Sequence, residues 1–272
     1  MAIPLEDFFN DVIGKAQRGL ALSDEALAHK AGLEISDLQR VLSGEKLEDI
    51  VRKLAPVLNL HEQSLVTMME QKWRPHPQDV DGLAQFNTPY GDMTVNAYVA
   101  WDMTSKAGVA FDTGADASVM ADIIRAHGVR LQAIFLTHTH PDHVADIATL
   151  RKNNQPIYAS QQEPWEGAEL FECGKEFKIG HLTIETRQTS GHSRGGVTYV
   201  LHGLSKPVAI VGDALFASSM GGGGVSYEEA LKTNRESIFT LPDNTVLCPG
   251  HGPMTTVVEE KRHNPFYPEF KR

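Results

Sequence analysis

The feature that most constrains this chain is a cluster of potential metal ligands shortly after the apolar segment 133–136. Four such ligands stand within six residues, in the run His138-Thr139-His140-Pro141-Asp142-His143. In an extended segment, side chains two residues apart point the same way, so His138 and His140 can bind one cation together. Pro141 is typical of the first turn of a helix, from which Asp142 and His143 would project toward a second cation. One short loop is therefore predicted to serve two metal ions.

Three more side chains of metal-binding type follow expected strands, each directly after a glycine. They are His192, Asp213 and His251. Glycine permits the turns in which strands end, and strand ends collect distant residues into one crevice of an α/β protein. Together with the first four, they give five histidines and two aspartates. Two sites of four or five ligands need about this number when a carboxylate and a water are shared.

The spacing of apolar residues along the chain changes near residues 73–82. Residues 1–72 have the spacing of amphipathic helices, with Ser23 and Ser36 as expected N-caps, and predict a small all-α domain. Residues 73–82 interrupt all periodicity with two prolines and are expected to form a linker. From residue 83 to 272, short β-branched runs alternate with helical ones, which predicts an α/β domain.

Individual elements follow from the same patterns. In the second domain, strands are expected at 94–101, 109–112, 133–137, 182–189, 197–201, 208–211 and 245–248, and helices at 117–127 and 143–152. In the first domain, Pro56 is expected to kink or split the helix 47–60.

From about residue 83 onward, the chain resembles the metallo-β-lactamase-fold hydrolases. Their H-x-H-x-D-H motif stands here as residues 138–143, and their later ligands match the other three positions. Four further segments are similar to the glyoxalase II-like branch of that family: 212–216, 241–243, 250–253 and 259–266. The resemblance implies a four-layer αββα sandwich with the metals at one edge, preceded here by the helical domain.

The resemblance also implies how the ligands are shared. The first metal would be bound by His138, His140 and His192, the second by Asp142, His143 and His251, and both by Asp213. Two Zn²⁺ ions are expected, with Fe or Mn as alternatives. Two cations lower the pKa of a shared water, and one of them polarises a substrate carbonyl. Asp142 is also expected to act in catalysis, by orienting the nucleophile or accepting its proton.

The implied activity is hydrolysis of a thioester or related ester in a small-molecule substrate, as in the hydroxyacylglutathione hydrolases. Arg194 and Tyr199 are the candidate substrate contacts. In segment 218–224, relatives of this branch carry a Gly-Arg element whose arginine is absent here. The recognition of glutathione therefore stays open.

Two other chemistries compete for the same residues. In a mononuclear iron enzyme similar to the persulfide dioxygenases, His138, His192 and Asp213 would hold the iron, although the presence of all seven ligands favours two metals. Residues 191–195 also match the G-x-S-x-G motif of serine hydrolases, with Ser193 as nucleophile. That motif needs a following helix, and the residues that follow are typical of a strand, so we reject this interpretation.

Within residues 1–72, the segment 23–44 and the helix after it resemble, more weakly, the helix-turn-helix domains of phage repressors. Eight Lys or Arg oppose twelve Asp or Glu there, a net charge of −4, whereas contact with phosphates needs positive charge. We therefore expect this domain to pack, to bind a partner or to form a homodimer rather than to bind DNA. A DNA-binding regulator with a metabolite-sensing second domain is the alternative.

The whole chain is acidic as well, with 25 Lys or Arg against 35 Asp or Glu and a net charge of −10. This charge is unsuited to nucleic acids and anionic membranes. Cys173 and Cys248 imply no disulfide framework. Acidic residues stand near the N terminus, where a signal peptide needs a basic start. A cytoplasmic protein without a membrane segment is expected.

Overall fold

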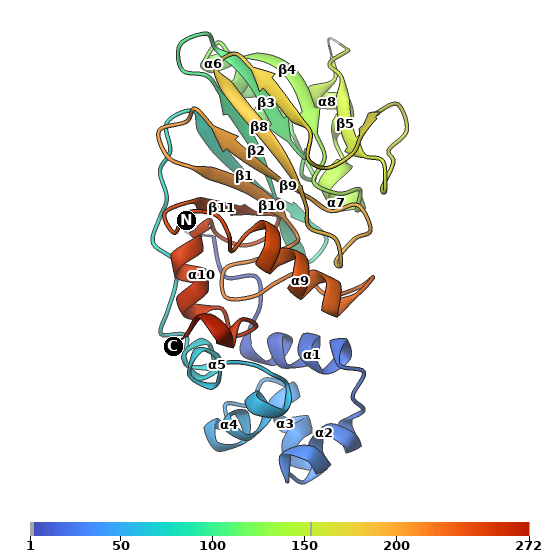
Figure 1. The fold of residues 1–272 in the computed structure, drawn as a ribbon, viewed down its shortest axis with the longest axis vertical. Coiled ribbons are helices and arrows are strands. Elements are labelled where there is room, and N and C mark those ends of the chain that lie inside the picture. The colour runs from blue at the N-terminus through green and yellow to red at the C-terminus, as the bar shows by residue number, and fades with distance from the viewer. Residues whose placement is uncertain (1–2, 153, 272) are drawn as a thin grey trace.

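The computed structural model describes residues 3–152 and 154–271. Two six-stranded sheets face each other in it, above the N-terminal helices in the view of Figure 1. The strands of the first sheet, in spatial order, are β1 (Leu83–Tyr90), β2 (Met93–Trp101), β3 (Ala107–Phe111), β4 (Arg130–Phe135), β5 (Ile157–Ser160) and β6 (Glu169–Phe171). Those of the second, in spatial order, are β12 (Thr255–Thr256), β11 (Val246–Pro249), β10 (Val208–Gly212), β9 (Val197–His202), β8 (Leu182–Gln188) and β7 (Glu176–Ile179).

The helices fall into two sets. Those of the N-terminal unit are α1 (Phe9–Gly19), α2 (Asp24–Ala31), α3 (Ile35–Leu42), α4 (Glu48–Val57) and α5 (Glu62–Met69). Those of the sandwich are α6 (Ser118–Ala126), α7 (Pro141–Val144), α8 (Ile147–Leu150), α9 (Tyr227–Ser237) and α10 (Val257–His263), followed by a short 3₁₀ turn at Pro268–Phe270. None of the helices in the described part of the chain has the length and apolarity that crossing a bilayer requires.

Three buried clusters show the layers. Aromatic rings from both sheets meet between them, including Phe111, Phe135 and Tyr199. The outer face of the first sheet packs on α6 and α8, and that of the second packs on the region of α9 and α10. The expected four-layer αββα sandwich is therefore confirmed. The central strands β3 and β10 are buried along their whole length, as strands covered on both faces must be.

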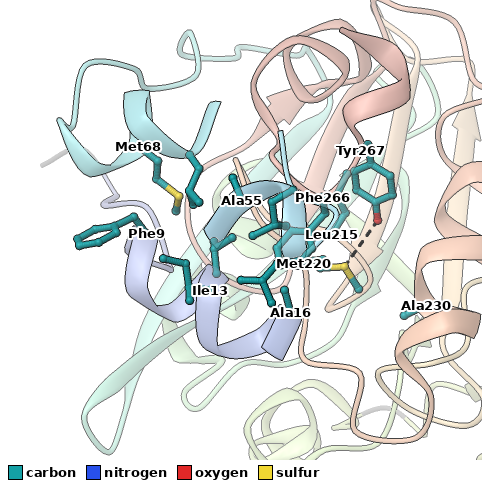
Figure 2. Packing of buried hydrophobic residues seen from close by; sticks show 14 of the residues in the cluster. Phe9, Ile13, Ala16, Ala55, Met68, Leu215, Met220, Ala230, Phe266 and Tyr267 are labelled. Atoms are coloured by element: carbon teal, nitrogen blue, oxygen red, sulfur yellow. Dashed lines mark hydrogen bonds between the residues drawn. The ribbon is translucent and has the colours of Figure 1, made fainter. Parts of the chain in front are cut away.

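The N-terminal helices share their core with the sandwich. One continuous cluster joins side chains of α1 such as Ile13 and Ala16 to Leu215, Met220 and Phe266 (Figure 2). The segment between the two parts has no regular secondary structure and lies against α10: the Trp73 ring stacks on His263 with centroids 4.4 Å apart. The helical unit is therefore packed onto the sandwich rather than tethered to it.

Local caps explain where the N-terminal helices begin and end. The Ser23 hydroxyl accepts a hydrogen bond from the amide of Ala26, 3.2 Å away, as expected of an N-cap. The expectation for Ser36 was wrong, because α3 already begins at Ile35 and its N-cap is Glu34 in extended conformation.

Pro56 lies in the last turn of α4, and the helix is not split there. The expected helix 143–152 is instead two short helices, α7 and α8.

The shared core predicts that the two parts lose stability together. Ile13 is fully buried, so Ile13→Ala should lower the free energy of unfolding by about 2–4 kcal/mol. Ile35, which is 38% exposed, provides the matched control, and Ile35→Ala should cost less than about 1 kcal/mol. Urea titration followed by tryptophan fluorescence and by far-ultraviolet circular dichroism measures both. Separate transitions for helices and sandwich in Ile13→Ala would contradict a common core.

Candidate metal centre

All seven predicted ligands lie at one edge of the sandwich, where strands from both sheets end. The residues follow β4, β8, β10 and β11 or stand in α7. They form two groups in which one ligand atom per residue lies within 4.8 Å of all the others: His138, His140, His192 and Asp213 in the first group, and Asp142, His143 and His251 in the second. The structure therefore brings together what the sequence separates by more than 100 positions.

The first group has the spacing of a four-ligand metal site. His140 Nδ1 lies 3.1 Å from both His138 Nε2 and His192 Nε2. Asp213 Oδ2 lies 3.4 Å from His192 Nε2 and 3.9 Å from His138 Nε2. Ligands held about 2.0–2.1 Å from a tetrahedral metal ion are roughly 3.3 Å from one another. These four atoms therefore surround a position that a metal ion fits.

The second group closes around the other side of Asp213. Asp142 Oδ2 lies 3.3 Å from His251 Nε2 and 3.6 Å from His143 Nε2. Asp213 reaches this group with both oxygens: Oδ1 lies 3.2 Å from His143 Nε2 and Oδ2 lies 3.3 Å from His251 Nε2. Asp213 is thus the carboxylate that both groups can share.

Two buried ligand atoms have no hydrogen-bond partner in the described part of the protein. His143 Nε2 and Asp213 Oδ1 are fully buried and make no hydrogen bond in the described structure, although they face each other at 3.2 Å. Buried polar atoms of this kind are costly and call for a ligand. Nitrogen and carboxylate donors in two sets of about four suit a divalent metal such as zinc. The residues present therefore fit two metal ions.

Hydrogen bonds on the far side of the ring fix which nitrogen of His251 and of His192 faces the centre. Nδ1 of His251 donates to the carbonyl of Thr94 at 2.7 Å, and Nδ1 of His192 donates to the carbonyl of Gly222 at 2.9 Å. Because a carbonyl can only accept, the proton must be on Nδ1, which leaves the Nε2 lone pair for a metal.

Asp112, at the end of β3, organises two more ligands. Its carboxylate accepts from His143 Nδ1 at 2.8 Å, from the Thr137 hydroxyl at 2.7 Å and from the Thr137 amide at 2.8 Å. The same hydroxyl lies 3.0 Å from His138 Nδ1. Asp112 holds a left-handed backbone with φ of 56°, which is strained for a residue with a side chain and recurs at functional sites.

Glu163, between β5 and β6, joins the two loops that carry the histidines of the first group. Its carboxylate accepts from the amide of Thr139 and from the amide of Gly195, both at 2.8 Å. Sequence analysis missed both Asp112 and Glu163. Asp112 is the last residue of an expected strand, close to where the ligands stand at other strand ends, and that position was its one signal. Glu163 stands in a stretch without any pattern.

The charges prepare the ligands for a cation. Burial is the main reason that the pKa of His138 lies well below its usual value, so this imidazole is neutral. Burial alone would raise the pKa of Asp213, but the neighbouring His143 and His251 hold it well below its usual value. Burial likewise opposes the charge on His143, yet Asp213 and Asp112 raise its pKa to about 10. The pocket therefore attracts positive charge, and a metal must displace protons to enter.

Glycines let the backbone approach the ligands. A Cβ atom on Gly250 would lie 2.1 Å from Asp213 Oδ1 and 2.6 Å from His143 Cε1. A Cβ atom on Gly212, which has φ of +50°, would lie 2.6 Å from the Thr137 hydroxyl. The sequence predicts a glycine-permitted turn before each later ligand. Gly212 and Gly250 are also needed because no side chain fits between the backbone and its neighbours at these two positions.

The two candidate substrate contacts have different outcomes. Tyr199 was predicted wrongly: it is fully buried between the sheets, and its hydroxyl donates to the carbonyl of Leu136 at 2.6 Å. The strand β9 is buried on both faces, so its side chains do not reach a substrate. Arg194 is exposed in the loop that carries His192, and its contact with a substrate stays a prediction. Ser193, beside it, is 4% exposed.

Comparison with known proteins places these residues in a family. The model of the metallo-beta-lactamase superfamily matches residues 90–251. The probable metallo-hydrolase YqgX of Bacillus subtilis is 32% identical over 203 residues, which are 65% of this chain and 94% of that protein. The hydroxyacylglutathione hydrolase GloC of Haemophilus influenzae is 27% identical, over 63% of this chain and 92% of its own. The mitochondrial persulfide dioxygenase ETHE1 of Bos taurus is 31% identical, over 62% and 69%.

Solved structures show the same likeness. The crystal structure of the BLEG-1 B3 metallo-beta-lactamase superposes with a TM-score of 0.59 and 29% identity, over 68% of this chain and 99% of that one. The structure of TTHA1623 in a di-iron-bound form superposes with a TM-score of 0.56 and 25% identity, over 66% and 99%.

The contact at Gly250 gives a test of the centre that leaves every ligand in place. In Gly250→Ala, the added methyl group must displace Asp213 or His143, so the affinity for metal should fall by at least about tenfold. Gly128→Ala is the control, because a Cβ atom there meets nothing within 4 Å and Gly128, between α6 and β4, lies outside the loops that carry the ligands, so backbone strain at its φ of +63° should leave the affinity for metal unchanged. Zinc competition with a coloured chelator measures both variants. Equal affinity in Gly250→Ala and the wild type would show that the ligands do not act together.

Proposed function

Because this chain belongs to the metallo-beta-lactamase superfamily, we propose that it is a binuclear metallohydrolase that cleaves a thioester or a related ester of a small molecule. The observation that carries the proposal is the position of Asp213 between two complete ligand groups. A site for one metal would not need Asp142, His143 and His251 around the second side of that carboxylate.

In the proposed mechanism, His138, His140 and His192 would hold the first cation, Asp142, His143 and His251 would hold the second, and Asp213 would be shared by both. When bound, two divalent cations supply Lewis-acid activation of a water molecule and of the substrate carbonyl. We propose zinc, with iron or manganese as alternatives.

The chain itself orients the reacting groups. Asp142 stands beside His251, and its carboxylate can hold a hydrogen bond from the attacking water or accept its proton. Thr94, Gly222 and Asp112 keep the imidazoles in a fixed orientation, so the ligands need not reorganise during the reaction. A thiolate is a good leaving group, which suits a centre without a strong general acid.

The substrate class rests on two observations of different kinds. GloC, whose name describes a hydrolase of hydroxyacylglutathione, is 27% identical over most of its length. Hydrolysis of a thioester is therefore the first choice. Segment 218–224 lacks the arginine that relatives of this branch carry, and its residues 218–221 are buried, so the recognition of glutathione stays open. Arg194 remains the proposed contact for an anionic group.

The runner-up is a persulfide dioxygenase with a single iron. It is favoured by the 31% identity to ETHE1 and would use His138, His192 and Asp213. We rank it second because His140 Nδ1 lies 3.1 Å from Nε2 of His138 and from Nε2 of His192, so His140 is placed as a fourth ligand that a three-ligand iron site would not use.

The helical unit is proposed to take part in packing or in homodimer formation rather than in DNA binding. Its net charge of −4 repels phosphates. Arg40, the cation of the α3 helix, is paired with Glu45 and Asp37 and is not free for a phosphate.

Elemental analysis with a substrate panel tests the proposal directly. We expect two transition-metal ions per chain and turnover of thioesters, with loss of activity on chelation and recovery on addition of zinc. The panel should include lactones, phosphodiesters and glutathione persulfide. One iron per chain, together with oxygen uptake on the persulfide, would reverse the ranking of the two functions.

Substitution of the shared carboxylate separates the metal centre from the serine-hydrolase alternative. Asp213→Ala should lower kcat/KM by roughly a thousandfold and remove metal, because both groups lose a ligand. His140→Ala should act similarly through the first group. Ser193→Ala, in a buried position outside the ligand set, should keep most of the activity. Complete loss of turnover in Ser193→Ala with both metals retained would overturn the mechanism.

A further inference from the structure

The loop 216–222, between β10 and α9, connects the metal centre to the N-terminal helical unit. It follows Asp213 along the chain, and its residues 216–221 are buried. The side chain of Met220 lies in the cluster shared with α1 (Figure 2). Other residues of the loop 216–222 contact two of the metal ligands. On the opposite side, the loop contacts two charged side chains of the helical unit.

Toward the centre, the loop fixes the positions of His192 and His251. The carbonyl of Gly222 accepts the hydrogen bond from His192 Nδ1 at 2.9 Å. Gly221 is pressed against the same ligand: a Cβ atom there would lie 2.8 Å from His192 Nδ1 and 2.0 Å from the carbonyl oxygen of Asp213. The Phe216 ring meets the His251 ring edge to face, with centroids 5.5 Å apart. A shift of this loop must therefore shift the ligands.

Toward the helical unit, the loop is held by Lys15 of α1. The ammonium of Lys15 donates to the carbonyl of Met220 at 2.8 Å and lies 5.1 Å from the centre of the Phe216 ring. It also pairs with Asp7 at 2.5 Å, and the same carboxylate oxygen accepts from the Ser219 hydroxyl at 2.5 Å. The side chains of Lys15 and Asp7 are only 14% and 10% exposed.

A buried ion pair of this kind is a weak source of stability, because removing both charges from water costs about as much as their attraction returns. Lys15 fixes the carbonyl of Met220, and Asp7 fixes the hydroxyl of Ser219. Both contacts hold the loop 216–222 from the N-terminal helical unit. Ser219 is also held from the C-terminal side of the chain, where the side-chain amide of Asn264 donates to its carbonyl at 2.8 Å. The contacts of Lys15, on α1, and of Asp7, just before it, are therefore placed to position the loop.

We propose that Lys15 is a positioning residue for the first ligand group, acting on His192 through the carbonyls of Met220 and Gly222. The N-terminal helical unit is thereby a structural part of the metal centre rather than a separate module. The inference rests on the proposed metal-binding function of the seven ligands. It assigns a task to a part of the chain that the family model, matched from residue 90, does not include.

Metal affinity, rather than activity alone, tests this role. Lys15→Met keeps the apolar stem and removes the donor, so it should weaken binding of the first metal ion about tenfold. Binding of the second ion should weaken less, because the loop contacts His251 only through the Phe216 ring and His251 is also held by the carbonyl of Thr94. Arg18→Met is the matched control, because Arg18 is an exposed cation one turn further along the same helix. Stepwise titration with cobalt, read from its visible absorption and from chelator competition, resolves the two ions. Equal first-ion affinity in Lys15→Met and the wild type would overturn the proposal.

Two further variants separate positioning from a general loss of stability. Lys15→Arg retains a cation and a donor and should recover the cobalt spectrum of the wild type at least in part. Asp7→Asn combined with Lys15→Met leaves no unpaired buried charge, so it should fold as stably as the wild type and still bind the first ion weakly. Recovery of full first-ion affinity in this double variant would show that the unpaired Asp7, and not the position of the loop, caused the loss.

Metal binding by the wild-type protein distinguishes failure of the proposed hydrolase from failure of the proposed role of Lys15. If the wild-type protein binds no metal ion, the metal centre and the role of Lys15 fall together. If it binds two and Lys15→Met binds both equally well, the proposed hydrolase stands and the role of Lys15 is refuted.

Discussion

The carboxylate of Asp213 is a buried negative charge with imidazoles on every side, and the rest of the structure is organised around it. Its Oδ1 makes no hydrogen bond, although His143 lies 3.2 Å away, and its Oδ2 is shared among His192 and His251. Such an arrangement is costly in a protein interior unless a cation completes it. The need to assemble five imidazoles and two carboxylates at this point explains why strands of both sheets end at the same edge.

The fold satisfies this constraint with backbone as much as with side chains. The carbonyls of Thr94 and Gly222 fix the tautomers of two ligands, and the glycines at 212 and 250 allow main chain to approach where a methyl group would collide. Asp112 accepts a strained conformation to reach His143. Supports of this kind determine the exact position of the ligands, which is what metal affinity and catalysis depend on.

Much of this arrangement could be predicted from the sequence, because the ligand motif is local and the later ligands stand after glycines at strand ends. What sequence analysis missed depends on tertiary contacts. Strand β1 contains Asn87 and Pro89 and shows no alternation, and it exists because β2 pairs with it. Helix α9 is largely polar, and its N-cap at Ser226 comes shortly after four consecutive glycines, so no apolar periodicity marks it in the sequence. Tyr199 was misplaced because periodicity cannot tell a strand buried on both faces from one with an exposed face.

We propose that the seven residues hold two metal ions and share one aspartate between them. A crystal structure of the zinc-loaded protein, with anomalous scattering recorded above and below the zinc absorption edge, would test this. Two anomalous peaks are expected, one within each ligand group, with Asp213 bound to both ions. A single peak among His138, His192 and Asp213, with Asp142 and His251 turned away from any metal, would contradict it.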